Sequence, residues 1–333
     1  MRKIKIAQIG MGHDHAVAPI DCFIKNTDVF EFVGLGLPES EKTDFADKIK
    51  NYPDVKIMTP EEILEIPGLD AVAIETEEVN LTKYSIMAAE KGIAIHMDKP
   101  GGIELSDFEK LIDIVKEKKI VFHLGYMYRY NPYVIDVMEK IKSGVLGDIY
   151  AVEAHMSCEH SKEKREWLGR FPGGMMFFLG CHLVDLVYAI KGKPDEVIAL
   201  NAPTGKDGVT AEDYGMAVFK YQNGASFVKS CAAEPGGFMR RQLVVCGTKG
   251  TVEIKPFEVL VAEGGIYTEK TETYEENGWS AKGELERTDV FDRYETMMKS
   301  FAAMVRGEKE NPWNYDYELE VYKLVLRACG VNL

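Results

Sequence analysis

Short apolar runs alternate with helical patterns through the first third of the chain. The runs are nearly continuous, which is typical of parallel strands buried on both faces of a sheet. Six runs are expected to form strands: Ile4–Ile9, Phe30–Leu35, Val55–Met58, Ala71–Glu75, Ile93–Met97 and Ile120–Leu124. Helix signals lie between them, including a capping box with proline at the first helical position, Thr59-Pro60-Glu61-Glu62. This alternation predicts a doubly wound parallel sheet.

The pattern changes after Leu124. Helices are expected from Asn131-Pro132 to near Gly144, over Met175–Ile190 after Gly173-Gly174, over Val290–Val305 and over Tyr317–Ala328. Strands are expected at Ile149–His155, Glu196–Leu200, Tyr214–Tyr221, Ala225–Ala232, Gln242–Cys246, Thr251–Ile254 and Val259–Ala262. Most of these strands follow one another with only turns between them, which predicts an antiparallel sheet. The polar stretch Gly278–Arg287 is expected to be a surface loop.

These patterns predict an α/β protein of two domains. Residues 1–122 would form an N-terminal Rossmann dinucleotide-binding domain, a doubly wound parallel sheet. Residues 123–333 would form a C-terminal α/β domain with a large, open, mainly antiparallel sheet. An open apolar sheet face is a liability unless something covers it. We therefore expect a homo-oligomer, either a dimer or a tetramer.

Composition and charge narrow the function classes. The net charge is −14, and the chain has no basic stripe, so we expect no nucleic-acid partner. No apolar run reaches the roughly 18–20 residues of a membrane span, so we expect no membrane partner. The N-terminus passes into a strand pattern without a signal-peptide core, and the six cysteines are scattered. Together these features indicate a cytoplasmic protein.

A glycine pair follows the first strand. Gly10 would allow a tight turn, and Gly12 would let the backbone approach a pyrophosphate at the end of the strand. The third position of this G-x-G-x-x-G pattern is His15. The acid expected after the second strand, which would bind a ribose hydroxyl, is replaced by Leu37, and no arginine stands there for a 2′-phosphate. The cofactor would be NAD or NADP, with NAD favoured.

Two histidine groups invite a metal interpretation. His13-Asp14-His15 follows the first glycines, and His155, Cys158 and His160 lie close together in the second half. Adjacent residues rarely converge on one ion, so we interpret the first group as a hydrogen-bonded turn and treat the second in the same way. We predict no metal.

Two further motifs carry candidate chemistry. Lys99 follows the fifth strand, at the edge of a doubly wound sheet where ligands bind, and Pro100 restricts its backbone to extended conformations. Phe178, His182 and Asp185 lie at helical spacing along the long apolar helix. Taken alone, the lysine also fits an ordinary polar loop, and the histidine also fits a structural position beside a core face.

The order and spacing of these motifs resemble the glucose–fructose oxidoreductase and inositol dehydrogenase family (Gfo/Idh/MocA) over essentially the whole chain. The matching motifs are Gly10-x-Gly12, Asp98-Lys99-Pro100, Arg129-Tyr130-Asn131-Pro132, Gly173-Gly174, Gly180-x-His182-x-x-Asp185, Asn223-Gly224-Ala225 and Gly247-Thr248-Lys249-Gly250-Thr251. The resemblance implies hydride transfer between a nicotinamide cofactor and a sugar, polyol or related alcohol or ketone. It also implies that Lys99 and His182 are catalytic, and that residues 123–333 serve substrate binding and oligomerisation.

The expected site combines the motifs with this resemblance. The cofactor-binding candidates are Gly10, Gly12, His13, His15, Thr76, Asp98, Lys99 and Pro100. The substrate-binding candidates are Tyr126, Arg129, Trp167, Phe178 and Asp185, with Tyr128 as a further lining residue. His182 would exchange the hydroxyl proton, and Lys99 would stabilise the developing alkoxide.

Some positions depart from the family pattern. Phe178 stands where polyol-oxidising relatives usually carry aspartate, Thr76-Glu77 replaces Thr-Pro, and Leu81 replaces a frequent histidine. The substitution at Phe178 favours a less hydroxylated or more apolar substrate. Two alternatives stay open: a non-catalytic dinucleotide- or sugar-binding regulator on the same fold, and an enzyme that retains NAD and catalyses elimination or hydrolysis.

Overall fold

The computed structural model describes residues 2–262, 264–278 and 280–333, and the chain divides into two compact units. The first unit joins Met1–Tyr126 with Tyr294–Tyr322, and the second joins Met127–Arg293 with Lys323–Leu333. The last helix, α11 (Tyr315–Ala328), therefore contributes residues to both units. The expected division into residues 1–122 and 123–333 stays a prediction.

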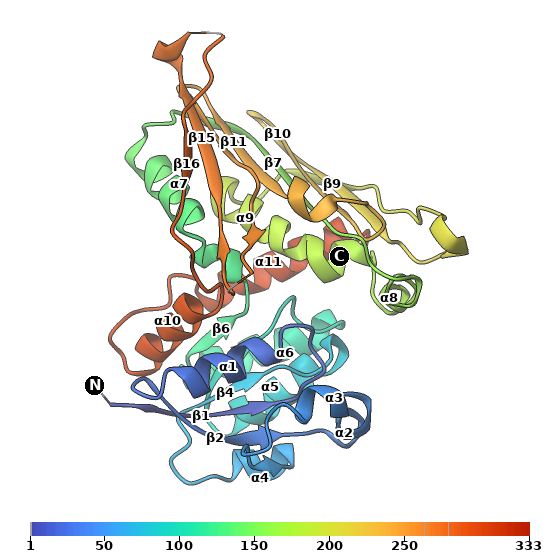
Figure 1. Ribbon diagram of the computed structural model, residues 1–333, viewed down its shortest axis with the longest axis vertical. Coiled ribbons are helices and arrows are strands. Elements are labelled where there is room, and N and C mark those ends of the chain that lie inside the picture. The colour runs from blue at the N-terminus through green and yellow to red at the C-terminus, as the bar shows by residue number, and fades with distance from the viewer. Residues whose placement is uncertain (1, 263, 279) are drawn as a thin grey trace. The chain divides into compact units, whose positions relative to one another are not determined.

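The first unit contains a six-stranded sheet in the order β3-β2-β1-β4-β5-β6, and its neighbouring strands pair in parallel. Its strands are β1 (Ile4–Ile9), β2 (Phe30–Gly36), β3 (Ile57–Met58), β4 (Ala71–Ile74), β5 (Ala94–Met97) and β6 (Phe122–Leu124). Its helices are α1 (Val17–Lys25), α2 (Glu39–Asp44), α3 (Ala46–Ile49), α4 (Pro60–Leu64), α5 (Leu81–Glu90), α6 (Leu105–Lys118) and α10 (Glu295–Val305). This is the expected doubly wound arrangement (Figure 1).

Burial and capping explain the central elements of this unit. Every residue of β4 is fully buried, as its apolar sequence requires of a strand covered on both faces. The predicted capping box is confirmed: the Thr59 hydroxyl accepts from the Glu62 N–H at 3.1 Å, and the Glu62 carboxylate accepts from the Thr59 N–H at 2.8 Å. Because the strands are parallel, their carboxyl ends lie at one edge of the sheet, and the candidate motifs after β1 and β5 lie at that edge.

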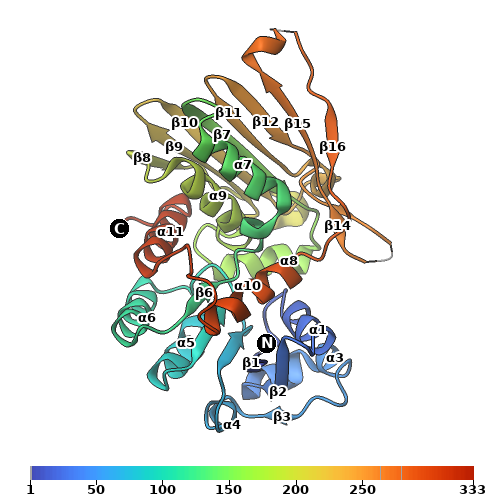
Figure 2. The same cartoon turned by 90° about the vertical axis from the view of Figure 1, so that its left-hand side faces the viewer.

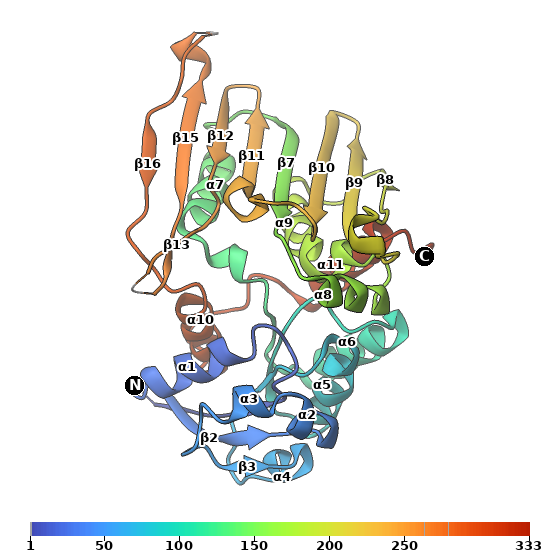
Figure 3. The same ribbon diagram turned by 45° about the vertical axis from the view of Figure 1, so that its right-hand side comes forward.

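The second unit contains an eight-stranded sheet in the order β16-β15-β12-β11-β7-β10-β9-β8. Its strands are β7 (Ile149–Ser157), β8 (Glu196–Ala199), β9 (Tyr214–Tyr221), β10 (Gly224–Cys231), β11 (Gln242–Gly247), β12 (Gly250–Ile254), β15 (Glu269–Tyr274) and β16 (Leu285–Arg287). All pairs are antiparallel except β7 with β10, so the expected open, mainly antiparallel sheet is confirmed (Figure 3).

Helices cover one face of this sheet. These are α7 (Pro132–Ser143) and α9 (Cys181–Lys191), which lie on the same side of the strands (Figure 2). The helix α7 starts where its sequence predicts, because the Asn131 side chain accepts from the Tyr133 N–H at 2.9 Å, and it ends at Gly144 with φ +76°. On the other face, residues such as Val218, Phe227 and Val244 are only half-buried.

The structure corrects several expected boundaries. The predicted strand Val55–Met58 is only the two-residue β3, and the last strand of the predicted series is β13 (Val259–Leu260), which pairs with β14 (Ile266–Tyr267) in a separate two-stranded sheet. The predicted helix over Val290–Val305 begins at Glu295. The polar loop predicted over Gly278–Arg287 contains the edge strand β16, while its residue 279 lies outside the described residues.

The predicted helix over Met175–Ile190 is not one regular α-helix. Residues Met176–Gly180 form a π-helical turn, and the α-helix α9 begins only at Cys181. A π turn widens the local spacing and is frequent at functional sites.

In the described part of the chain, no helix combines the length and the apolar character needed to cross a membrane.

Candidate functional site

The glycine loop lies at the carboxyl end of β1, where the first unit's sheet presents its ligand-binding edge. Gly10 has φ +94°, a conformation that favours glycine, and a Cβ there would meet the Thr76 backbone nitrogen at 2.5 Å. A Cβ on Gly12 would meet the Glu77 nitrogen at 2.4 Å. Both glycines are therefore required by close approach of the β4–α5 loop, in addition to any role towards a cofactor.

Glu41 on α2 contacts this loop through its carboxylate. Oε2 accepts from the N–H groups of Met11 at 2.6 Å and Gly12 at 3.0 Å, and Oε1 accepts from the Glu77 N–H at 3.0 Å. The residue is almost completely buried, with 1% of its surface exposed. Burial raises the pKa of Glu41, although these three N–H groups oppose the shift. The loop thus binds an anionic group, and this anion belongs to the chain itself.

This contact tests whether the loop suits a dinucleotide. The fold places the pyrophosphate of a bound dinucleotide on the N–H groups of the first glycine-rich turn. The N–H groups of Met11 and Gly12 converge on a carboxylate, so their direction and polarity fit an anion. The loop therefore fits the pyrophosphate chemically.

Three predicted cofactor residues converge beside the loop. The Nδ1 atoms of His13 and His15 lie 2.9 Å and 3.1 Å from the same oxygen of Asp98, Oδ2. The other Asp98 oxygen accepts from the Lys99 N–H at 2.7 Å. Asp98 and the Lys99 side chain are buried, with 2% and 1% exposed. The structure thus joins two sequence motifs that are more than 80 residues apart.

The electrostatics of this cluster centre on Asp98. Burial alone would raise the pKa of Asp98, but contacts with His13 and His15 hold it well below its usual range. Burial lowers the pKa of His15 to about 4, although the charge of Asp98 opposes this shift. Burial and then the charge of Asp98 raise the pKa of Glu75 well above its usual range. An ionised Asp98 and an uncharged His15 are therefore expected at neutral pH.

The same three residues are the group in the described part of the chain whose ligand atoms could surround a metal ion. Their ligand atoms lie within 4.8 Å of one another. On one zinc ion with bonds of about 2.0–2.1 Å, ligand atoms lie roughly 3–3.5 Å apart. Hydrogen bonds to Asp98 account for both histidine contacts, so we assign no ion here.

The remaining cofactor candidates also lie in the first unit. Thr76 is fully buried beside Gly10, and its hydroxyl donates to the Glu77 carbonyl at 3.2 Å. Pro100 follows a cis Lys99–Pro100 bond. Leu37, at the position of the usual ribose-binding acid, is 2% exposed and packs in an apolar cluster with Met11 and Ile20. Leu37 thus serves the core rather than the ligand edge.

The second unit holds His182, whose ring lies edge-on to Tyr128 with centroids 4.9 Å apart. Tyr128 donates to Glu258 at 2.7 Å and stacks on Phe257. Glu258 also accepts from Arg241 at 2.7 Å. Burial and then the charge of Glu258 raise the pKa of Tyr128, which keeps its hydroxyl protonated. This network holds the tyrosine ring against His182, and sequence reasoning missed Glu258 and Arg241.

Two predicted substrate residues of the second unit pair with each other. The Arg129 guanidinium donates to Asp185 through Nε at 2.9 Å and 3.1 Å and through Nη2 at 2.6 Å. Both side chains are buried. Burial raises the pKa of Asp185, and the Arg129 charge opposes this shift. Contact of this pair with a substrate stays a prediction. Tyr126, which is also a predicted substrate residue but belongs to the first unit, is buried as well.

Phe178 and Trp167 form an aromatic cluster in the second unit. Their rings are perpendicular with centroids 5.4 Å apart, and the Lys164 ammonium lies over both rings, 3.6 Å from Trp167 and 4.5 Å from Phe178. Trp167 and Lys164 belong to the short helix α8 (Lys162–Trp167). The structure therefore brings these two predicted substrate residues together and adds Lys164, which the sequence did not single out.

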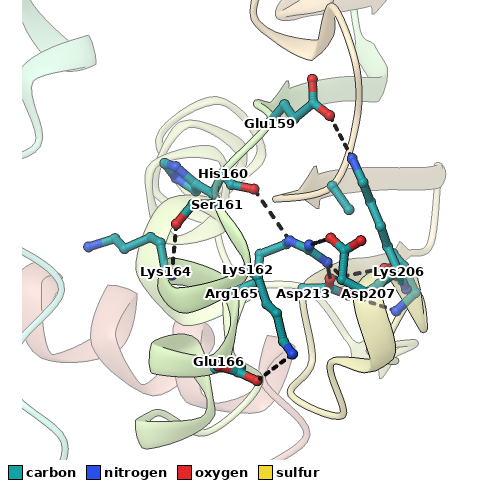
Figure 4. Close-up of polar contacts among 12 residues, drawn as sticks. Glu159, His160, Ser161, Lys162, Lys164, Arg165, Glu166, Lys206, Asp207 and Asp213 are labelled. Carbon is teal, nitrogen blue, oxygen red and sulfur yellow. Dashed lines mark hydrogen bonds and ion pairs between the residues drawn. The ribbon is translucent and has the colours of Figure 1, made fainter.

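A buried arginine anchors α8 (Figure 4). Arg165 donates to the carbonyls of His160 at 3.3 Å and Lys206 at 2.9 Å, and it pairs with Asp207 and Asp213. These contacts fix the helix that carries Trp167 against the loop before β9. The arrangement gives the aromatic cluster a rigid support.

Comparison with known proteins gives a consistent picture. Residues 134–253 match the family model described as the GFO/IDH/MocA C-terminal domain. The chain is 35% identical over 201 residues to scyllo-inositol 2-dehydrogenase (NAD(+)) of Bacillus subtilis, covering 59% of this chain and 58% of that enzyme. It is 22% identical over 258 residues to myo-inositol 2-dehydrogenase of Thermotoga maritima, covering 75% and 73%. The matched region is thus less than two thirds of the B. subtilis enzyme.

Solved structures share the whole fold. A Desulfitobacterium hafniense protein whose name proposes an NADPH-dependent oxidoreductase superposes with a TM-score of 0.81 at 19% identity, over 99% of this chain and 95% of that one. A Sinorhizobium meliloti protein whose name proposes a myo-inositol dehydrogenase superposes with a TM-score of 0.75 at 17% identity, over 98% of both chains. At these identities the likeness concerns the fold.

Proposed function

We propose that the chain is a member of the Gfo/Idh/MocA family and an NAD(P)-dependent oxidoreductase that acts on a CH–OH group of a sugar, polyol or related compound. The observation that carries this proposal is the anion-binding loop, in which the N–H groups of Met11 and Gly12 point at a carboxylate at the end of β1. Relatives named as inositol dehydrogenases support the substrate class.

The proposed cofactor site uses the loop and the cluster beside it. Gly10 and Gly12 would hold the pyrophosphate, and His13, His15, Thr76, Asp98, Lys99 and Pro100 would line the rest of the dinucleotide. A bound nicotinamide would supply the hydride that the reaction exchanges. NAD is the proposed form, because the segment after β2 has no arginine that would hold a 2′-phosphate.

The proposed chemistry depends on two residues. His182 would accept the hydroxyl proton when an alcohol is oxidised and return it in the reverse direction. Lys99 would donate a hydrogen bond to the same oxygen and stabilise its developing negative charge. Tyr128, held by Glu258, would keep the His182 ring in one orientation. Each residue thus has one task at one substrate oxygen.

Substrate selection is proposed to involve Tyr126, Arg129, Trp167, Phe178 and Asp185. Phe178 and Trp167 offer aromatic rings, with the Lys164 ammonium over them, where polyol-oxidising relatives usually have a carboxylate. A substrate with fewer hydroxyl groups on that side fits such a surface better, because a hydroxyl buried against rings lacks a hydrogen-bond partner.

One specific observation favours a second candidate. The Glu41 carboxylate lies on the N–H groups that a dinucleotide would need. If the carboxylate stays there, the protein would be the sugar-binding form of the dinucleotide- or sugar-binding regulator expected on this fold. Binding of NADH distinguishes this candidate from the oxidoreductase, since a regulator that binds only a sugar would not bind NADH.

We also propose a cytoplasmic homo-oligomer, a dimer or a tetramer. The half-buried apolar residues on the uncovered face of the eight-stranded sheet support association. The six cysteines are scattered along the chain, a usage typical of a reducing compartment. Light scattering at micromolar concentration tests association, and a monomeric mass would contradict it.

The direct test of the function is an absorbance screen at the nicotinamide band. Purified protein would be incubated with polyols, sugars and hydroxy acids, each with NAD and with NADP. Reduction of one cofactor by at least one compound is expected. Substrate consumption without net reduction of the cofactor would instead identify an enzyme of the NAD-retaining type.

A further inference from the structure

The glycine loop of the first unit carries an internal anion. We propose that Glu41 competes with the dinucleotide pyrophosphate for the N–H groups of the loop and thereby sets the affinity for the cofactor. This inference rests on the proposed function, because it concerns the same binding site. It assigns to the helix after β2 a role that its sequence does not indicate.

The hydrogen bonds of Glu41 establish the competition. Its two oxygens together accept three backbone N–H groups, from Met11, Gly12 and Glu77, at 2.6–3.0 Å. Hydrogen bonds to an ionised acceptor are stronger than those between neutral groups. Each of these N–H groups has one hydrogen and is already committed to the carboxylate. A pyrophosphate that used the loop would have to displace it.

The space beside Gly12 supports the same conclusion. A Cβ built on Gly12 would lie 2.7 Å from Oε1 of Glu41. In this fold the second glycine of the motif leaves room for the backbone to approach the pyrophosphate. Here the carboxylate occupies part of that room. Glu41 therefore competes by volume as well as by charge.

The surroundings allow the carboxylate to be exchanged for another anion. The Lys48 ammonium donates to the carbonyls of Met11 at 3.1 Å and His13 at 2.9 Å, so a cation stays beside the loop whichever anion is bound. The side chain of Glu41 comes from α2, a six-residue helix without a side-chain cap. Burial also raises the pKa of Glu41, which indicates that the environment holds its charge imperfectly.

The mechanism predicts a measurable affinity change. If Glu41 occupies the loop most of the time, the apparent dissociation constant for the cofactor increases by the inverse of the vacant fraction. Removing its charge frees the N–H groups. In Glu41→Gln, the amide oxygen accepts hydrogen bonds more weakly than a carboxylate, and its NH₂ group cannot accept. NADH should therefore bind on the order of 10-fold more tightly.

The experiment is a calorimetric titration of NADH into the purified full chain. Wild type, Glu41→Gln and Glu41→Asp would be compared, because aspartate keeps the charge but shortens the reach by one methylene. Both variants should bind NADH more tightly than wild type. The matched control is Glu39→Gln, an exposed acid on the same helix that pairs with Lys42 rather than the loop, and it should bind like wild type. ADP-ribose, which lacks the nicotinamide, should show the same order of affinities.

The outcomes separate this inference from the proposed function. If wild type binds NADH and neither Glu41 variant binds it more tightly, the competition is refuted while the function stands. If no form of the protein binds NADH, the proposed cofactor function fails, and the inference fails with it. Circular dichroism would show whether Glu41→Gln folds. If it does not fold, tighter NADH binding by Glu41→Asp alone would still support the competition.

Discussion

Replacing Asp185 by asparagine should destabilise the second unit strongly. Asp185 accepts three short contacts from Arg129, and the two side chains are only 1% and 2% exposed. The substitution keeps the size of the side chain but leaves the arginine charge buried without a counter-charge. Breaking such a pair by removing one partner typically costs about 3–5 kcal/mol.

The magnitude converts into a shift of the melting temperature. For a unit of this size, each 1 kcal/mol corresponds to roughly 2–4 °C, so Asp185→Asn should melt about 6–20 °C below wild type. Thermal unfolding followed by circular dichroism and by calorimetry measures this shift. The double variant Arg129→Met with Asp185→Leu removes both charges and should recover most of the lost stability. Such recovery would show that Asp185→Asn is destabilised by the unpaired Arg129 charge rather than by altered packing.

A different result would overturn this reasoning. If Asp185→Asn melts within a degree of wild type, the ion pair does not hold the second unit together. A raised KM with unchanged stability would instead show that Asp185 acts mainly on substrate.

Three further predictions follow from the first unit and the aromatic cluster. Gly12→Ala should lower stability by about 1–3 kcal/mol, because its Cβ would meet the Glu77 nitrogen at 2.4 Å. Gly169→Ala, whose Cβ would lie 3.3 Å from the Ala211 side chain, should change the thermal melt less. Burial lowers the pKa of His96 from 6.5 to about 4, so the unfolded state takes up a proton first as pH falls. Stability should therefore decrease between about pH 6.5 and 4 by up to about 3 kcal/mol, and urea midpoints for His96→Asn should depend less on pH than those of wild type. Phe178→Asp should shift activity towards more hydroxylated substrates, and an unchanged ranking of substrates by kcat/KM would count against a role in selection.

The sequence predicted the elements whose own residues form a recognisable local pattern, such as an apolar run or a capping box. The parallel strands of the first unit appear as apolar runs, and Thr59 and Glu62 form their capping box through residues three apart. The strand β15 was missed because its sequence, Glu269–Tyr274, is polar on both faces. The edge strand β16 was taken for a loop for the same reason, since backbone pairing with β15 rather than apolar burial forms it.

The candidate site was predictable only in part. The glycine motif and Lys99 follow strands, so the topology of the sheet places them at its ligand edge. The contact of Glu41 with Met11 spans 30 positions, and that of His15 with Asp98 spans 83. No local pattern encodes such contacts, because they depend on how the connections after β2 and β5 fold back on the loop. For the same reason Glu258 and Arg241 left no signal in the sequence.

The most direct test of the proposed function is the rate of NAD reduction by wild type and by His182→Ala on one polyol substrate found in the screen. We expect the variant to lose on the order of 10²-fold or more in kcat, because the proton acceptor is gone. Its affinity for NADH should be unchanged, since His182 belongs to the second unit and the proposed dinucleotide residues belong to the first. A His182→Ala variant that reduces NAD at the wild-type rate would contradict the proposed mechanism.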